Sequence, residues 1–319
     1  RNALALVYAT IAGNAAQMVF SYILHPYKPE LEIEWQKARD LYNFGRWIFG
    51  SSILVFVAVH ADDIFAGKYL GVAALGIYQL SFRISNSMAS EITGVVGEVT
   101  FPAFSKLQGN IDQLRRAFFN TVEASIGISA PLAAGLFILA PDFVHIVLEP
   151  KWEPMIPILR ILTVSGLIRA LASTGGPLVN AVGKPRLNFW INLVRTSLLA
   201  ASIYPLTSLY GLSGTAYAVL LGLSGSLLLW LFFMSRTVDT TYQQLLGKVG
   251  PPLGGSMLMV ISILIAKWLL PQLNLPLFFA LIFIGVCTYF IFSFIIWRLF
   301  RIGLIRSLKV MLSYARSQE

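Results

Sequence analysis

The stretch "SFRISNSMASEITGVVGEVTFPAF", Ser81 to Phe104, places one arginine and two glutamates inside a long apolar segment. On a helix each residue turns by about 100°, so one strip about 80° wide carries Arg83, Ser87, Glu91, Gly94 and Glu98. A charge at the middle of a bilayer costs roughly 2.5–3.5 kcal/mol on insertion scales, so such side chains normally face a bundle interior or water. The pattern predicts a transmembrane helix whose polar stripe faces away from lipid.

The composition of the whole chain agrees with a membrane location. Of its 319 residues 56% are hydrophobic and only 12% are charged, against about 25% charged residues in soluble domains. The mean hydropathy is +0.72. Apolar residues gather in blocks of about 20, the length of a membrane-crossing helix. We therefore expect an all-α, polytopic transmembrane bundle, whose net charge of +9 reflects loops facing anionic lipid rather than a nucleic-acid partner.

Nine spans can be drawn along the chain. Their approximate bounds are Ala3–Leu24, Phe44–Val59, Val72–Phe101, Phe118–Leu139, Ile156–Val182, Leu187–Leu209, Gly214–Met234, Gly254–Leu270 and Leu275–Trp297. Between the first two, Glu30–Phe44 has apolar residues at helical spacing with charges on other faces. That segment is expected to lie along the membrane interface as a separate helix.

The loops between these spans differ in charge. One set holds nearly all of the lysines and arginines, whereas the opposite set holds only Lys68 and Lys151 beyond Arg1, together with acids such as Asp62 and Asp63. Because Lys and Arg accumulate in cytoplasmic loops, the C-terminus is expected to be cytoplasmic and the first residue outside.

The fifth predicted span carries a second set of polar residues. Arg169, Ser173, Gly176 and Asn180 share one face, and Arg160 points the other way near the outer end. "STGGP", Ser173 to Pro177, is expected to break this helix inside the membrane, which bundles tolerate where backbone lines a cavity. Further ionisable residues within spans are Arg195, Glu123 and Lys267; Lys267 is expected to reach the interface.

These residues allow two interpretations. Either the charges form internal ion pairs that lock helices together, or they line a polar cavity for a charged substrate or coupling ion. Since the arginines outnumber the acids, an anionic headgroup such as a diphosphate would suit the cavity. The predicted substrate-binding residues are Arg83, Arg160, Arg169, Asn180 and Arg195, and the predicted ion-coupling residues are Glu91 and Glu98.

Enzymatic and metal-dependent chemistry lacks support in the sequence. The single cysteine, Cys287, lies in an apolar block, and His25, His60 and His145 lack the spacing of metal ligands. No nucleophile–base pair or phosphate-binding loop is recognisable. We expect a protein that is not an enzyme, with no cofactor and no metal site.

Four stretches resemble the Wzx-type polysaccharide flippases of the multidrug/oligosaccharidyl-lipid/polysaccharide exporter superfamily. They are "GVAALGIYQLSFRI" (Gly71 to Ile84), "VTFPAFSKLQGNIDQLRRAF" (Val99 to Phe118), "LEPKWEPMIPILRIL" (Leu148 to Leu162) and "NAVGKPRLNFW" (Asn180 to Trp190). Each motif alone is weak, but their order and spacing together are specific, and the resemblance covers nearly the whole chain.

The resemblance implies a fourteen-helix protein of two lobes, of which this chain would lack the first five helices. Its domains would be the last N-lobe helix (1–25), a cytoplasmic interfacial linker helix (26–43), a six-helix, MATE-like C-terminal lobe (44–235), and two additional helices with a basic tail (236–319). The implied function is to flip undecaprenyl-diphosphate-linked oligosaccharide units across the bacterial inner membrane by alternating access, for surface polysaccharide synthesis. The implied partners are this lipid-linked oligosaccharide, membrane lipids, a polysaccharide polymerase and a chain-length regulator.

Other functions remain open from the sequence. A multidrug antiporter of the same superfamily would share the fold and differ only in cargo. A membrane oligosaccharide polymerase should have a large external loop, whereas the longest here is about fifteen residues. A glycosyltransferase should carry a cytoplasmic acidic pair, and the only adjacent acids, Asp62 and Asp63, are expected in an outer loop. A membrane scaffold would not require the polar stripe.

Overall fold

Long helices make up the fold. The computed structural model describes residues 3–24, 34–270 and 274–300, and within these ranges all the regular elements are helical. They are α1 (Ala3–Leu24), α2 (Trp35–Leu70), α3 (Val72–Leu107), α4 (Ile111–Val147), the 3-10 turn η1 (Pro150–Trp152), α5 (Met155–Ser173), α6 (Gly175–Ala181), α7 (Pro185–Thr237), α8 (Tyr242–Leu269) and α9 (Leu275–Phe300). The expected all-α fold is confirmed.

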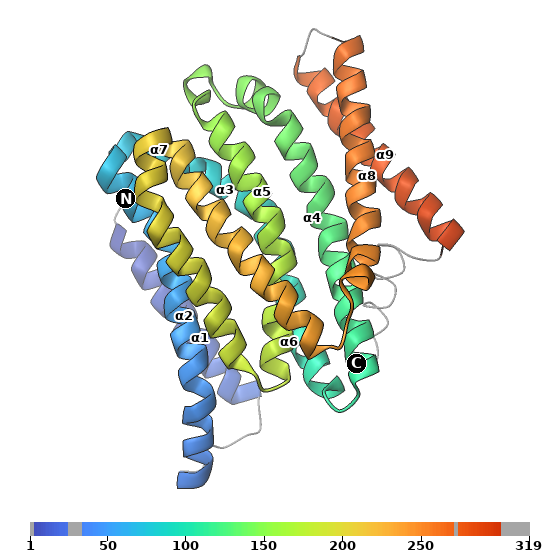
Figure 1. The fold of residues 1–319 in the computed structure, drawn as a ribbon. Helices are drawn as coiled ribbons and strands as arrows, with labels where there is room; N and C mark the ends of the chain where they lie inside the picture. Colours follow the sequence, from blue (N-terminus) through green and yellow to red (C-terminus); the bar gives the residue numbers. More distant parts are fainter. Residues whose placement is uncertain (1–2, 25–33, 271–273, 301–319) are drawn as a thin grey trace. The chain divides into compact units, whose positions relative to one another are not determined.

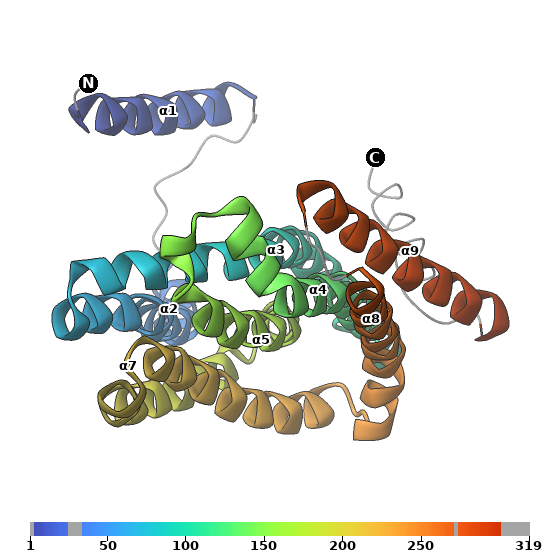
Figure 2. The same cartoon turned by 90° about the horizontal axis from the view of Figure 1, so that it is seen from above.

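Six of the described helices are long and apolar enough to cross a membrane: α2, α4, the combined α5–α6 segment, α7, α8 and α9. The chain is therefore a multi-pass membrane protein. Contacts divide it into two compact units, Arg1–Asn43 and Phe44–Glu319. In the second unit α3, α4, α5 and α7 pack side by side, and α8 lies along α4 with α9 beside it (Figures 1 and 2).

The helix boundaries differ from the predicted ones in several places, among them α4, which extends beyond Phe118–Leu139 at both ends, and α8, which begins at Tyr242 rather than near Gly254. The expected end of the third span at Phe101 is wrong, since α3 includes Pro102 and ends at Leu107. Packed membrane helices tolerate proline because neighbouring groups satisfy the freed carbonyl. The helix beginning at Trp35 continues through Phe44 without a break, so it joins the part of the expected interfacial segment from Trp35 onward to the second expected span; residues 30–33 of that segment lie outside the described residues. It also extends to Leu70, well beyond Val59.

The predicted break in the fifth span is confirmed. The segment divides at Thr174 into α5 and the short α6. Residues 180–184 then turn the chain into α7, with Gly183 in the left-handed region at φ 74°.

Two spans were expected where α7 lies, and α7 is indeed a helical hairpin. Gly211 interrupts the helical backbone at φ 59° and ψ −137°, a conformation that glycine adopts without steric cost. The two halves then pack very closely. The hydroxyls of Thr207 and Thr215 lie 2.9 Å apart, and a Cβ on Gly222 would lie 2.9 Å from the carbonyl oxygen of Arg195.

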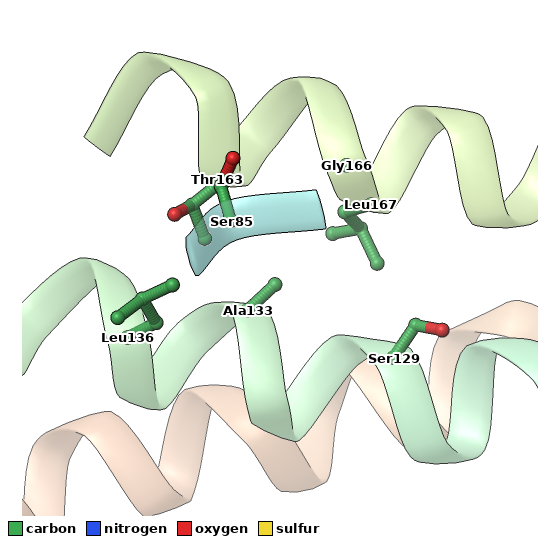
Figure 3. Close-up of a pocket in the computed structure, with 7 residues that line it drawn as sticks. All are labelled: Ser85, Ser129, Ala133, Leu136, Thr163, Gly166 and Leu167. Carbon is green, nitrogen blue, oxygen red and sulfur yellow. The ribbon is translucent and has the colours of Figure 1, made fainter. Parts of the chain in front are cut away.

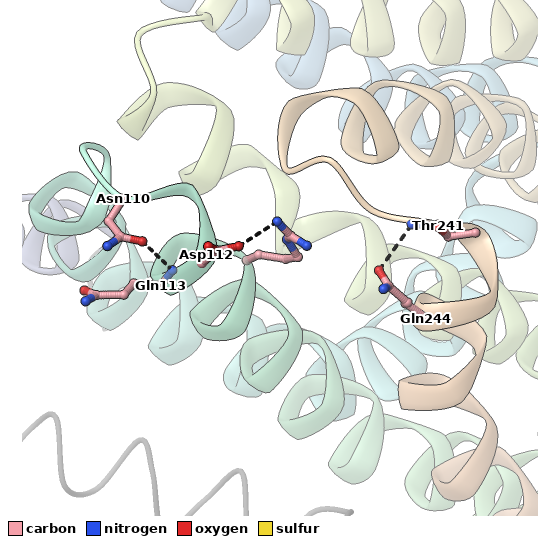
Figure 4. Close-up of polar contacts among 6 residues, drawn as sticks. Asn110, Asp112, Gln113, Thr241 and Gln244 are labelled. Carbon is pink, nitrogen blue, oxygen red and sulfur yellow. Dashed lines mark hydrogen bonds and ion pairs between the residues drawn. The ribbon is translucent and has the colours of Figure 1, made fainter.

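Side chains cap the starts of α4 and α8 (Figure 4). Asn110 Oδ1 accepts a hydrogen bond from the Gln113 N–H at 3.1 Å. At α8, the Thr241 N–H donates to Gln244 Oε1 at 3.3 Å, within a reciprocal capping box. Such caps satisfy N–H groups that have no partner inside the helix. They define where both helices begin, and α4 and α8 then run along each other.

Candidate functional site

The polar stripe on α3 lies on a continuous helix, as predicted. Arg83 and Ser87 are exposed on it, and the Ser87 hydroxyl donates to the Ile84 carbonyl of its own helix. The backbone of α3 is helical at Glu91 and Glu98, whereas the side chains of residues 88–99 lie outside the described part of the structure. The ion-coupling role of the two glutamates therefore stays a prediction.

Arg169 lies in the last turns of α5 and turns toward α3. Its guanidinium donates a hydrogen bond to Asn86 Oδ1 and lies 5.2 Å from the ring centroid of Phe82. Its Nε atom is buried and has no hydrogen-bond partner. A guanidinium has five donor N–H groups, so this side chain retains donor capacity inside the bundle.

Asp62 is a site residue that the sequence analysis misplaced. Instead of lying in an outer loop, it is inside α2 with only 2% of its surface exposed. Its carboxylate accepts hydrogen bonds from the Tyr78 hydroxyl at 2.7 Å and from the Asp63 N–H at 3.0 Å. Tyr78 itself is fully buried on α3. A buried carboxylate needs such donors, because desolvation disfavours its charge.

Arg195 on α7 completes a charge cluster with Asp62 and Arg169, in which the carboxylate is buried and both arginines are half-buried. The charge of Asp62 attracts both guanidinium groups, and the two arginines repel each other. Neither arginine forms a direct ion pair with Asp62 among the described residues. We call Asp62, Arg169 and Arg195 the buried charge cluster. The carboxylate of Asp63 lies beside that of Asp62 and accepts a hydrogen bond from Gln79 Nε2 at 3.2 Å, so two carboxylates and two guanidinium groups gather in this region.

Asn180 does not join this cluster. It lies on α6, beyond the break at Thr174, and its Oδ1 accepts a hydrogen bond from Asn188 Nδ2 at 2.9 Å. The next turns of α7 bind α2 in the same way: Asn192 donates to the Ser51 hydroxyl at 2.8 Å, and the Thr196 hydroxyl donates to the Leu54 carbonyl at 3.2 Å. These interhelical hydrogen bonds are typical of packed membrane helices.

Arg160 is also separate from the cluster, as the expected direction of its side chain implied. Its Nε donates to the Phe137 carbonyl of α4 at 3.1 Å, and its guanidinium lies 5.5 Å from the Phe137 ring centroid. The structure therefore brings Arg169 and Arg195 together and leaves Arg83, Arg160 and Asn180 in different surroundings.

Two of the remaining ionisable residues within spans hold α8 against α4. Lys248 Nζ lies 3.0 Å from Glu123 Oε2, and Lys267 Nζ lies 2.6 Å from Asp142 Oδ2. On each helix the two positions are 19 residues apart (142 − 123 and 267 − 248). This separation corresponds to about 28 Å at 1.5 Å per residue, close to the ~30 Å hydrocarbon thickness of a bilayer. Lys267 was expected only to reach the membrane interface, and the structure shows in addition that it forms an ion pair with Asp142.

The cavities within the second unit are mostly apolar. A cavity of about 10 Å³ among α3, α4 and α5 is the size of a single water site (Figure 3). It is lined by Ser85, Ser129, Ala133, Leu136, Thr163, Gly166 and Leu167. Larger hollows, of about 330 Å³ between α4, α5 and α8 and about 180 Å³ between α4, α8 and α9, have almost entirely apolar walls. Neither one is lined by residues of the buried charge cluster.

Residues 1–157 match a family model described as polysaccharide biosynthesis protein. A Klebsiella pneumoniae membrane protein in the cps region is 27% identical over 92% of this chain and 64% of its own length. The lipopolysaccharide biosynthesis protein WzxC of Escherichia coli (strain K12) is 26% identical over 68% of this chain and 44% of its own length. The chain thus spans less than two thirds of the length of these relatives.

Among solved structures, the lipid II flippase MurJ in an inward closed conformation has the same fold. It superposes with a TM-score of 0.67 at 17% identity, over 88% of this chain and 59% of that chain. Together with the helical bundle, these similarities agree with the resemblance noted in the sequence: the chain is a multi-pass membrane protein that is similar to polysaccharide and lipopolysaccharide biosynthesis proteins and shares the fold of a lipid II flippase.

Proposed function

We propose that this chain is part of a transporter that flips undecaprenyl-diphosphate-linked oligosaccharide units across the bacterial inner membrane by alternating access. The transported units serve surface polysaccharide synthesis, and the chain performs no enzymatic step. Its C-terminus is cytoplasmic. The partners of the complete transporter are membrane lipids and, in the same pathway, a polysaccharide polymerase and a chain-length regulator. Similarity to proteins named for polysaccharide and lipopolysaccharide biosynthesis supports the assignment of cargo.

The unused donor of Arg169 is the structural observation that supports the proposal most directly. Its Nε is buried without a hydrogen-bond partner, and neither Arg169 nor Arg195 forms a direct ion pair with Asp62 among the described residues. A buried donor without a partner is costly. A diphosphate would accept hydrogen bonds from the guanidinium forks.

Asn86 and Phe82 explain how Arg169 is held when no cargo is bound. The Asn86 amide occupies one donor group, and the Phe82 ring supports the plane of the guanidinium. Both contacts are neutral, so an anionic oxygen competes with them favourably. Arg83, exposed on the next position of α3, extends the cationic path, and we assign Arg160 and Asn180 to its periphery.

Transport in reconstituted membranes tests this function. Protein from the complete gene is placed in vesicles with undecaprenyl-diphosphate oligosaccharide carrying a dithionite-sensitive fluorophore on the sugar. Dithionite added outside should bleach nearly all of the label if flipping occurs, and only the outer-leaflet half in protein-free vesicles. Bleaching limited to the outer leaflet in protein-containing vesicles, together with efflux of a cationic dye, would favour a multidrug antiporter instead.

Glu91 and Glu98 are proposed as the groups that couple transport to an ion gradient. They lie two turns apart on the face of α3 that carries Arg83. Glu91→Gln keeps the shape of the side chain and removes its charge. The variant should bind cargo normally and lose the dependence of transport on pH or sodium, while Glu98→Gln should have the smaller effect. An unchanged ion dependence in Glu91→Gln would remove the coupling role from this residue.

A further inference from the structure

Two arginines from different helices converge on one tryptophan near the beginning of the second unit. The guanidinium carbon of Arg46, on α2, lies 5.4 Å from the ring centroid of Trp47, and that of Arg186, in the first turn of α7, lies 5.2 Å from the same centroid. Residues 46 and 186 are far apart in the sequence, so the helical packing itself creates this arrangement. We call Arg46, Trp47 and Arg186 the Trp47 clamp.

The packing around the clamp fixes its geometry. The ring of Phe189, one turn along α7, stands edge-on against Trp47 with the centroids 5.3 Å apart. One turn farther into the membrane, the Asn192 amide binds the Ser51 hydroxyl of α2 at 2.8 Å. Both helices are therefore held in register beside Trp47, and the two arginines are presented from fixed backbone positions.

Basic groups gather at the clamp. Neither Arg46 nor Arg186 forms an ion pair with a carboxylate in the part of the chain that the structure describes. Lys184 is exposed beside Arg186, and no side chain caps the start of α7. A helix N-terminus has a positive potential, so all of these groups attract an anion. Both guanidinium groups are exposed, so each has donors that can form charge-assisted hydrogen bonds with an anion.

The position of the clamp identifies the kind of anion. Trp47 is half-buried, and Trp190, in the first turns of α7, is 42% exposed. Tryptophans concentrate at the headgroup level of membranes, and basic groups beside them attract anionic lipids. We propose that the Trp47 clamp binds the phosphate of an anionic glycerophospholipid in the leaflet that surrounds the start of α7. This site is distinct from the buried charge cluster and does not depend on transport.

Quenching of Trp47 fluorescence by brominated lipid tests the proposal. The chain is placed in nanodiscs containing either brominated phosphatidylglycerol or brominated phosphatidylcholine, and the Trp47 signal is obtained by subtracting that of Trp47→Phe. Each arginine near the membrane surface contributes about a fivefold preference for anionic lipid. Half-maximal quenching of Trp47 should therefore require at least about fivefold less phosphatidylglycerol than phosphatidylcholine.

The matched variants assign the preference to the clamp. Arg46→Gln combined with Arg186→Gln should abolish it, whereas replacement of both by lysine should preserve part of it. Arg236→Gln is the control, because Arg236 is a single arginine stacked on one ring, that of Phe232, at 4.2 Å. Its substitution should leave the preference unchanged.

Three results would overturn the proposal. The first is equal quenching of the Trp47 signal by both lipids when Arg46 and Arg186 are unchanged. The second is an unchanged preference in the double glutamine variant. The third is loss of the preference on adding inorganic phosphate, which would show a site for free phosphate rather than for a lipid headgroup.

Discussion

Charged side chains are paired differently in two regions of the molecule. One region is the contact between α4 and α8, and the other is the group formed by α2, α3, α5 and α7. Between α4 and α8 each lysine touches a carboxylate directly, at 3.0 Å and 2.6 Å, and the two pairs lie near opposite ends of the apolar segments. In the other group Asp62, Arg169 and Arg195 influence one another without direct contact. Their hydrogen bonds are made instead with Tyr78, Asn86 and the Asp63 N–H.

This difference separates anchoring charges from charges available to a ligand. A paired lysine and carboxylate satisfy each other, so they fix the position of α8 on α4 and have little left to offer a cargo. The arginines of the buried charge cluster retain unused donors, including the buried Nε of Arg169. Substitutions in the cluster should therefore impair transport, whereas substitutions at the α4–α8 contact should lower stability.

Substitution of Arg169 should have the largest effect. In the complete protein, Arg169→Ala should reduce export more than about a hundredfold, since two charge-assisted hydrogen bonds are worth about 3 kcal/mol or more. Arg169→Lys should restore part of the export, because it keeps the charge and loses the fork. The measurements are surface polysaccharide and the amount of protein in the membrane.

The partner variant Asp62→Asn separates function from folding. If Arg169 only balances Asp62, then Arg169→Ala should lower membrane abundance, and adding Asp62→Asn should restore both abundance and export. If Arg169 binds cargo, abundance recovers in the double variant while export remains lost. Restored export would show that the cluster is a structural ion network rather than a binding site for cargo.

Lys248→Ala should give the largest loss of stability. Glu123 is only 1% exposed, and removing the partner of a buried charge costs about 3 kcal/mol. Thermal unfolding in detergent measures the loss. Exchanging the two residues, Glu123→Lys with Lys248→Glu, should recover most of it, and a double variant no more stable than Lys248→Ala would contradict an anchoring ion pair.

Lys267→Ala should cost less, about 1 kcal/mol, because the pair with Asp142 is more exposed and solvent screens it. The same unfolding assay in low and high salt checks this ranking. Added salt should shrink the effect of Lys267→Ala more than that of Lys248→Ala. A larger loss for Lys267→Ala than for Lys248→Ala would reverse the order inferred from burial.

Arg160→Ala should have the smallest effect, about 0.5 kcal/mol of stability for its stacking on Phe137 and no more than a twofold change in export. It is the control for Arg169→Ala, since both residues lie on α5. Loss of export in Arg160→Ala would show that the cationic path follows the α4 side of the bundle as well.

The sequence was sufficient to predict most of the helices. Apolar blocks and turn residues located the ends of the α5–α6 segment, α7 and α9 to within a few residues, together with the break near Ser173 and the hairpin around Gly211. The ends of α4 were missed by seven and eight residues, and the start of α8 by 12 residues. The end of α3 was missed because Pro102 continues a helix that its neighbours support. The extension of α2 past Val59 was missed because "HADD" is polar, and its burial at Asp62 depends on Tyr78, which comes from the next helix.

The candidate site was less predictable for a related reason. Helical periodicity shows which residues share a face of one helix, and so it singled out Arg169 and Arg195 as polar residues within spans. It does not show which faces of different helices meet. The pairings Lys248–Glu123 and Lys267–Asp142 each join residues 125 positions apart, and the capture of Asn180 by Asn188 depends on the turn between α6 and α7.

The hairpin within α7 has a mechanical consequence for the cluster. The hydroxyl pair of Thr207 and Thr215 and the tight approach of Gly222 to the Arg195 carbonyl prevent the two halves from sliding along each other. The two halves of α7 are therefore expected to move as one rigid body that pivots at Gly211. Arg195 lies 16 residues from Gly211, about 24 Å away at 1.5 Å per residue. A tilt of about 5° there displaces Arg195 by about 2 Å, enough to exchange one hydrogen-bond partner for another.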